Sequence, residues 1–305
     1  MSRAYLLIVL LCFGCSREQI TAVSDLAGGM LAKSSPLPCL PDATPSQIVD
    51  ACGNDPRYYL PMSALYVLGN EMPAVHRLQG ELAAAQVQPI DGKIRVVAEG
   101  HSNALRVFDA FTTLLSSSSL DNPQIRFTNN AAGGMALENW VAAGVGTIDT
   151  RVQIVFLHHS LNKGFADCSQ QTYADSTAFY LRARVLQLKV KYPNAKQIFL
   201  QSREFGGWKC YSAPGAAAEP AGYFNGFGVK AFIDSQVSGS DSALAYTNAP
   251  FLAWSFNPWD PTTPRSWFEG AGLHPCTTGA NFWAQQWFDF LLNDSTTRSW
   301  FAANP

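Results

Sequence analysis

The sequence lacks the features of several common protein classes. Charged residues make up only 14% of the 305 residues, no run of five like charges occurs, and the formal net charge is −2. Because a nucleic-acid surface needs a basic patch, this composition argues against nucleic acid as a partner. No apolar run reaches the roughly 20 residues that a membrane-spanning helix needs. The 47% of apolar residues is instead enough for the core of one large domain.

The first fifteen residues resemble an export signal. Arg3 supplies a positive charge, an apolar run extends from Tyr5 to Phe13, and a Gly-Cys pair ends at Cys15. This pattern predicts a signal peptide, and it also resembles a lipoprotein signal in which Cys15 would be lipidated. We therefore expect an exported protein, either a bacterial lipoprotein or a periplasmic or extracellular one, that meets a membrane only through such an anchor. An ordinary cleaved secretory peptide is the alternative.

Cysteine usage agrees with export. Five cysteines follow residue 15, and two pairs of them are candidates for disulfides: Cys39 with Cys52, and Cys168 with Cys210. The sequence does not fix this pairing, and Cys276 would be left over. Beyond residue 15 there is no Cys-x-x-Cys spacing, and no His-x-x-x-His spacing occurs, so a structural zinc site is not indicated.

Regular secondary structure is predicted to begin at Lys93, which opens a domain over 93–305. We interpret the preceding segment, 16–92, as a tether and an irregular lead-in. Its first part, 16–60, is rich in Ser, Pro, Ala and Asp, whereas 61–92 is ambiguous, with 62–68 as a candidate short helix. Short apolar segments indicate strands at 94–98, 124–128, 153–157, 196–201 and 250–254. Helices are predicted at 103–115, 137–143, 173–192, 222–236 and 281–292.

This alternation of strands and helices indicates βαβ units and a mainly parallel sheet. The strands are apolar without polar alternation, as expected for a sheet that is covered on both faces. In such sheets the functional loops lie beyond the carboxyl ends of the strands. The residues that could carry chemistry fall in those loops.

Ser102 and His274 are the candidate nucleophile and base. Ser102 follows the first strand at a predicted strand-to-helix turn, where a hydroxyl can project at the edge of the sheet. A serine hydroxyl needs a base to take its proton, and the pKa of histidine suits that task. His274 precedes the last helix. The alternatives are that Ser102 only caps its helix and that His274 is a surface histidine.

Two other loops hold candidate groups. Gly133 and Gly134 follow the second strand, where a glycine N–H can approach a developing oxyanion. Asn162, after the third strand, could donate its amide to the same oxyanion. His158 and His159 invite a metal interpretation, but adjacent residues of an extended chain point to opposite faces and make poor joint ligands.

Taken together, these loops resemble the SGNH (GDSL-like) hydrolase family, which is named for a serine, a glycine, an asparagine and a histidine in this order. The resemblance rests on Gly100-His101-Ser102-Asn103, Asn130–Gly134, Asn162 and Gly272–Pro275. The stretch 202–207 resembles a Ser-Arg-x-x-Gly-Gly loop of an uncharacterised exported bacterial subgroup. The similarity extends from about Lys93 to Leu292.

The resemblance implies an α/β fold of the flavodoxin-like type, with three α/β/α layers around a mainly parallel five-stranded sheet. It implies ester hydrolysis without a cofactor, with Ser102 as nucleophile and His274 as base. It also implies an oxyanion hole made by the N–H groups of Ser102 and Gly134 and by the amide of Asn162.

Two positions depart from the family pattern. The family usually places an aspartate three residues before the histidine, where this chain has Ala271. Glu269 is the nearest acid and the catalytic candidate, and Asp260 is a more distant one. Loss of the orienting acid costs about 10⁴ in turnover in trypsin-type triads. A relocated acid, a slow dyad and an inactive protein are therefore all open. The second departure is His101, which stands where an aspartate is usual.

The expected substrate is an acyl or acetyl ester, either a small molecule or a glycan. Arg203 could grip a substrate carboxylate, and His101 and Trp208 are further candidates for substrate contact. Trp208 belongs to a group of C-terminal tryptophans that could stack on sugar rings or only pack in loops: Trp208, Trp254, Trp259 and Trp267. The rival hypothesis is a catalytically degenerate protein that binds a glycan, and Ala271 is the residue that favours it.

Overall fold

The computed structural model describes residues 64–66, 69–161, 169–205, 219–269 and 272–303. The predicted signal peptide with Cys15, most of the lead-in, and the site candidates Asn162 and Trp208 lie outside these residues, as does Ala271. In the described part of the chain, no helix combines the length and the apolar composition needed to cross a membrane.

Five parallel strands form one sheet, in the order β2-β1-β3-β4-β5. The strands are β1 (Ile94–Gly100), β2 (Ile125–Asn129), β3 (Val152–His158), β4 (Gln197–Gln201) and β5 (Phe251–Trp254). This order is that of flavodoxin-like sheets, in which ligands bind where the direction of the connections reverses, between β1 and β3. The expected three-layer architecture is confirmed, and every neighbouring pair of the sheet is parallel.

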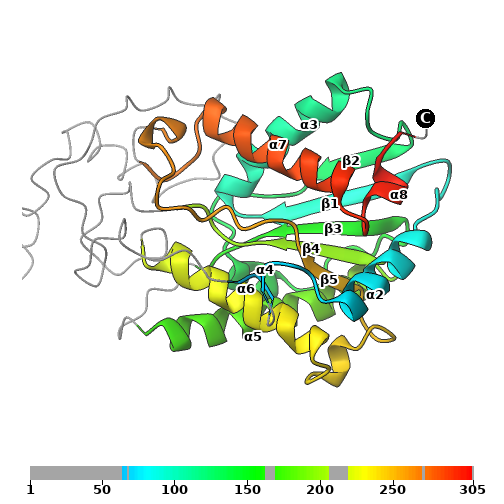
Figure 1. Ribbon diagram of the computed structural model, residues 1–305, viewed down its shortest axis with the longest axis horizontal. Helices are drawn as coiled ribbons and strands as arrows, with labels where there is room; N and C mark the ends of the chain where they lie inside the picture. Colours follow the sequence, from blue (N-terminus) through cyan, green and yellow to red (C-terminus); the bar gives the residue numbers. More distant parts are fainter. Residues whose placement is uncertain (1–63, 67–68, 162–168, 206–218, 270–271, 304–305) are drawn as a thin grey trace, which may run out of the picture.

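Helices cover both faces of the sheet (Figure 1). One face carries α3 (Ser102–Ser117) and α7 (Thr277–Asn293), and the other carries α4 (Leu137–Ala143), α5 (Gln170–Lys191) and α6 (Ala221–Val237). Beside the amino ends of the strands lie α2 (Ala74–Ala85) and α8 (Arg298–Phe301). Two short 3₁₀ helices, Ser242–Leu244 and Arg265–Trp267, complete the elements of the described chain. The predicted helices from residue 103 onward are confirmed.

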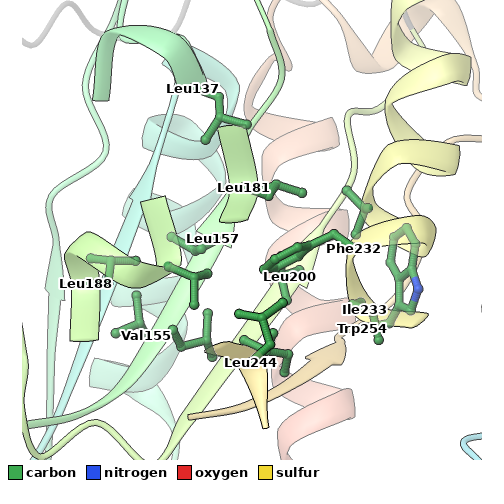
Figure 2. Packing of buried hydrophobic residues seen from close by; sticks show 14 of the residues in the cluster. Leu137, Val155, Leu157, Leu181, Leu188, Leu200, Phe232, Ile233, Leu244 and Trp254 are labelled. Atoms are coloured by element: carbon green, nitrogen blue, oxygen red, sulfur yellow. The ribbon is translucent and has the colours of Figure 1, made fainter. Parts of the chain in front are cut away.

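The two faces of the sheet bury different kinds of side chain. The face under α5 and α6 is mainly aliphatic, and Leu157, Leu181 and Leu200 lie in its centre (Figure 2). The face under α3 and α7 is aromatic, and Trp287 stacks on Phe156 with ring centroids 4.5 Å apart. Every residue of β3 is buried, as expected for a central strand that is covered on both faces.

The segment before β1 departs from the prediction, because α2 lies within the expected irregular lead-in. Its apolar residues Val75, Leu78 and Leu82 are exposed, and the face that it buries is formed by His76, Gly80 and Ala84. An inward stripe of small and polar residues does not give the usual signal of an amphipathic helix. Of the candidate helix 62–68, the described residues 64–66 are not helical.

Candidate active site

Ser102 lies where β1 passes into α3. Gly100 ends the strand, and a Cβ atom there would come within 2.4 Å of the His158 carbonyl oxygen and 2.3 Å of the Ala104 Cβ, so the close approach requires glycine. His101 is the N-cap of α3, and its Nδ1 accepts the Asn103 N–H at 3.1 Å. The capping role, which was the alternative for Ser102, therefore belongs to His101. The Ser102 hydroxyl instead contacts His274.

Ser102, His274 and Glu269 form a continuous chain of hydrogen bonds. Ser102 Oγ and His274 Nε2 are 2.8 Å apart, although 172 residues separate them in sequence. On the other side of the ring, His274 Nδ1 is 2.8 Å from Glu269 Oε1. The side chains of His274 and Glu269 are 14% and 5% exposed. A hydroxyl, an imidazole and a carboxylate are thus aligned as nucleophilic catalysis requires.

A tight turn lets Glu269 reach His274 from five residues away. The Glu269 N–H donates to the His274 carbonyl at 3.0 Å, and the Gly272 N–H donates back to the Glu269 carbonyl at 2.7 Å. Gly272 has φ +64°, a left-handed conformation that suits glycine. The turn places the two side chains at its base beside each other. Asp260, the other acidic candidate, instead accepts from the N–H and hydroxyl of Thr262 in its own local turn.

Arg106 holds the carboxylate of Glu269 in place. Its Nη1 and Nη2 donate to the two oxygens of Glu269 at 2.6 and 3.0 Å, and Nη1 also donates to the Pro275 carbonyl at 3.2 Å. Arg106 lies four residues after Ser102 on α3, on the same face of the helix. Sequence analysis missed this residue, although that spacing is a signal that could have found it.

Burial and neighbouring charges set the protonation of the pair. Burial lowers the pKa of His274 below its usual 6.5; the Glu269 carboxylate opposes this change, and Arg106 adds to it. Burial acts to raise the pKa of Glu269, but the hydrogen bond from His274 and the charge of Arg106 outweigh it and lower this pKa. At neutral pH the ring is therefore neutral and able to accept a proton, and the carboxylate is ionised.

The loop with Gly134 lies beside the carboxyl end of β1. The Ala132 N–H donates to the Gly100 carbonyl at 3.1 Å, and Trp140 Nε1 donates to the same oxygen at 3.3 Å. Gly134 has φ +74°, and the space where its Cβ would be is open. The structure thus brings this loop next to the turn that carries Ser102. Asn162, the third expected oxyanion donor, lies outside the described residues.

The three histidines near Ser102 are buried. His101 is 7% exposed, and its ring centroid lies 5.0 Å from that of His158. The ring centroid of His159 instead lies 6.1 Å from that of the Trp140 indole. His158, the last residue of β3, and His159, which follows the strand, thus have different neighbours. Among the described residues, no group of three or more His, Cys, Asp or Glu side chains is placed to hold a metal ion.

The remaining substrate candidates are largely buried. Arg203 is 6% exposed, and its Nη1 donates to Ser160 Oγ at 3.4 Å. Trp254 and Trp259 are buried and pack in the core and against Phe205, respectively, so they do not form an exposed platform. Trp267 is half-buried against Phe282.

The loop that carries His274 is also held by a disulfide. Cys276, the cysteine that the two suggested pairs would leave over, is disulfide-bonded. Those two pairs therefore do not describe the complete pairing, and the other cysteines lie outside the described residues.

Comparison with known proteins gives structural likeness only. No family model matches the chain, and no curated protein matches its sequence. Among solved structures, it is similar to the C-terminal catalytic domain of Streptococcus pneumoniae peptidoglycan O-acetyltransferase A, at 10% identity and a TM-score of 0.40 over 70% of this chain and 99% of that one. It is similar to a possible lipase from Chitinophaga pinensis, at 12% identity and a TM-score of 0.38 over 65% and 97% of the two chains.

A third similar structure is an extracellular lipase from Streptomyces rimosus, at 13% identity and a TM-score of 0.31 over 66% of this chain and 99% of that one. Such low identities and TM-scores carry no weight for function, which has to be argued from this chain's own residues.

Proposed function

We propose that this protein is a serine esterase of the SGNH type that hydrolyses acyl or acetyl esters. Ser102 is the nucleophile, His274 the general base and Glu269 the acid that orients the imidazole. The observation that carries the proposal is the continuous chain from Ser102 Oγ through the imidazole to Glu269, with both contacts at 2.8 Å.

In this reaction, Ser102 Oγ attacks the ester carbonyl carbon while its proton passes to His274 Nε2. The Nδ1–H of the ring donates a hydrogen bond to Glu269, whose negative charge stabilises the imidazolium that forms. Collapse of the tetrahedral intermediate breaks the bond to the alcohol, which leaves with the proton from Nε2. A water molecule, deprotonated by the same ring, then attacks the acyl-serine. The bond from the acyl carbon to Ser102 Oγ breaks, the ring returns the proton to this oxygen, and the acid is released. Each step uses only groups of this chain and water, so no cofactor is required.

The oxyanion of this intermediate needs donors on the side of Ser102 away from His274. We assign this role to the main-chain N–H groups of Ser102 and Gly134 and to the side-chain amide of Asn162. Support comes from the position of Ser102 in the first turn of α3, where helix N–H groups and the helix dipole favour negative charge. The Ala132–Gly100 hydrogen bond, which holds the Gly134 loop beside β1, adds to it.

We propose an acyl or acetyl ester, on a small molecule or a glycan, as substrate, with Arg203, His101 and Trp208 near its polar part. Arg203 lies at the carboxyl end of β4, on the same edge of the sheet as Ser102. A rival function is a degenerate relative that binds a glycan without hydrolysing it. That hypothesis depends on the lack of an acid at position 271, and Glu269 supplies a carboxylate to the ring from another position.

The test is hydrolysis of p-nitrophenyl acetate by the wild type, by Ser102→Ala and by the control Ser116→Ala, which lies on the exposed end of the same helix. We expect Ser102→Ala to lower turnover by at least about 10⁴-fold, as loss of the nucleophile does in serine hydrolases. Ser116→Ala should hydrolyse at the wild-type rate. Equal rates for Ser102→Ala and the wild type would reject the enzyme function.

For its location, we propose export through the N-terminal signal, with lipidation of Cys15 as the form that would attach the protein to a membrane. Expression of the wild type and Cys15→Ser followed by fractionation of the cells tests this. A membrane-bound wild type and a released variant are expected, whereas an equally soluble pair would reject the lipid anchor and leave an ordinary secreted protein.

A further inference from the structure

A buried asparagine follows Ser102 in the first turn of α3. Asn103 is 1% exposed, and its side-chain nitrogen Nδ2 donates to two acceptors: Glu204 Oε2 at 3.0 Å and the Leu273 carbonyl at 3.2 Å. Since both partners are acceptors, only the amide nitrogen can face them. Its two N–H groups are thereby both used, and the orientation of the amide is fixed.

The location of these partners gives Asn103 its importance. It follows Ser102 in the first turn of α3, and Leu273 immediately precedes His274. The amide of Asn103 thus links the residue after Ser102 to the residue before His274, although 170 residues separate Asn103 from Leu273. Ser102 and His274 are the two groups between which the proton would pass. Serine and imidazole must stay within hydrogen-bonding reach for this transfer, and small misplacements of reacting groups are costly.

Glu204 anchors the asparagine from the other side. It is a carboxylate beyond the carboxyl end of β4, only 1% exposed, and its Oε1 is 3.3 Å from His158 Nε2. Burial acts to raise the pKa of Glu204, but His158 and the Asn103 amide outweigh this and keep the pKa below its usual value. A buried charge is costly unless it is paired, so this carboxylate holds its partners in place.

We propose that Asn103 is a positioning residue for the reaction proposed above: its amide, oriented by Glu204, ties α3 to the Leu273 carbonyl and sets the distance from Ser102 Oγ to His274 Nε2. This inference rests on the proposed esterase function. It adds Asn103 and Glu204 to the groups on which turnover depends, although neither touches the reacting atoms.

The first test compares Asn103→Leu with a matched control, Gln197→Met. Gln197 is also fully buried, and its amide also donates to two acceptors, the carbonyls of Gly80 and Thr296, but at the opposite end of the sheet. Both substitutions roughly keep the shape of the side chain and remove two donors, and Gln197→Met also removes the acceptor of the Trp300 indole N–H at 2.7 Å. Both should therefore lower the melting temperature, the control at least as much as Asn103→Leu. Only Asn103→Leu should lower kcat, by about ten- to a hundredfold with little change in KM, because misplacement affects the transition state.

A double variant separates positioning from stability. Asn103→Asp places an acceptor against a carboxylate and a carbonyl, and it should lose both stability and turnover. Adding Glu204→Gln gives the new carboxylate at position 103 a donor again but leaves the Leu273 carbonyl without one. The double variant should therefore regain melting temperature relative to Asn103→Asp without regaining kcat. Recovery of both together would mean that Asn103 is only structural, and it would overturn the proposal.

A crystal structure of Asn103→Leu tests the positioning role without an activity measurement. The proposal predicts that the Ser102 Oγ to His274 Nε2 distance grows beyond hydrogen-bonding range, whereas an unchanged distance together with wild-type kcat overturns it. If the wild type itself hydrolyses no ester, the esterase function fails, but this distance still decides whether Asn103 holds the two side chains together.

Discussion

Two arginine–glutamate pairs in this protein have the same chemistry but different surroundings. Glu99 of β1 is fully buried and is paired with two cations: Arg184, with both contacts to Oε2 at 3.0 and 2.7 Å, and Lys191 at 3.0 Å. Glu269 is paired with one cation, Arg106, and its Oε1 also bonds a titratable ring, that of His274. Of these two carboxylates, only Glu269 is linked to a proton acceptor and a hydroxyl.

The partners of each arginine extend the contrast. Arg184 also donates to the carbonyls of Trp140 and Gly144, so the first pair fastens α4 to the sheet. Arg106 also donates to the Pro275 carbonyl, so the second pair fastens the turn that carries His274 to α3. In these two pairs, the carboxylate that contacts only cations is structural, whereas the one that also contacts the imidazole beside Ser102 is placed for the proposed catalysis.

Replacing the carboxylate of the second pair should have the largest effect. Glu269→Gln removes the charge that stabilises the imidazolium, and we expect turnover of p-nitrophenyl acetate to fall by about 10⁴-fold, as in other triads. Because Arg106 is 21% exposed and can be solvated, the melting temperature should change little. A variant with wild-type turnover would show that His274 works without Glu269.

The matching substitution in the first pair should act on stability. Glu99→Gln leaves Arg184 buried at 1% exposure without a full counter-charge, and breaking such a pair costs about 3–5 kcal/mol of unfolding free energy. Urea denaturation measures this loss, while turnover per folded molecule should be roughly unchanged. If Glu99→Gln lost turnover and kept its stability, the distinction between the two pairs would be wrong.

Removing Arg106 should have an intermediate effect with a characteristic pH dependence. Burial lowers the pKa of His274 and Arg106 lowers it further, so Arg106→Met should raise this pKa. Because the base must be neutral to accept a proton, the acid limb of the kcat/KM profile should move to higher pH. Turnover should also fall by about tenfold to a hundredfold, because Glu269 loses the side chain that holds it in place. A pH–rate profile of both proteins measures the shift. A limb that stays in place or moves to lower pH would contradict the assignment.

Some parts of the molecule could be predicted from the sequence, and others could not. The strands could be predicted because their apolar runs are plain, and the later helices because of their length and of stop signals such as Pro193. The pairing of Ser102 with His274 followed from loops at one edge of a parallel sheet. The choice between Glu269 and Asp260 could not be made, because it depends on a turn with Gly272 at φ +64°.

Other site residues were missed for a different reason. Asn103 and Glu204 are isolated polar residues in sequence, and only the fold brings the end of β4 to the first turn of α3. The helix α2 was missed because its apolar residues face outward, so the pattern that normally identifies a buried face was misleading. Sequence patterns, which compare nearby residues, thus do not reveal contacts between loops that are distant in sequence.

The smallest expected effect is the loss of stability in mild acid. Burial, followed by neighbouring positive charge, holds the pKa of both His101 and His159 well below 6.5 in the folded protein. Below pH 6.5 the unfolded chain therefore binds more protons than the folded one, and the free energy of unfolding should fall as the pH decreases from about 7.5 to about 5.5. Urea denaturation at both values measures it. His159→Phe should reduce the dependence, and an identical dependence in that variant would contradict burial of a neutral ring.

The most direct test of the triad is the site at which a serine-reactive fluorophosphonate labels the intact protein, located by mass spectrometry. The account predicts one label per chain, on Ser102, formed quickly in the wild type, slowly in Glu269→Gln and not in His274→Ala. A label on another serine, or labelling of Ser102 at the same rate in all three proteins, would contradict it.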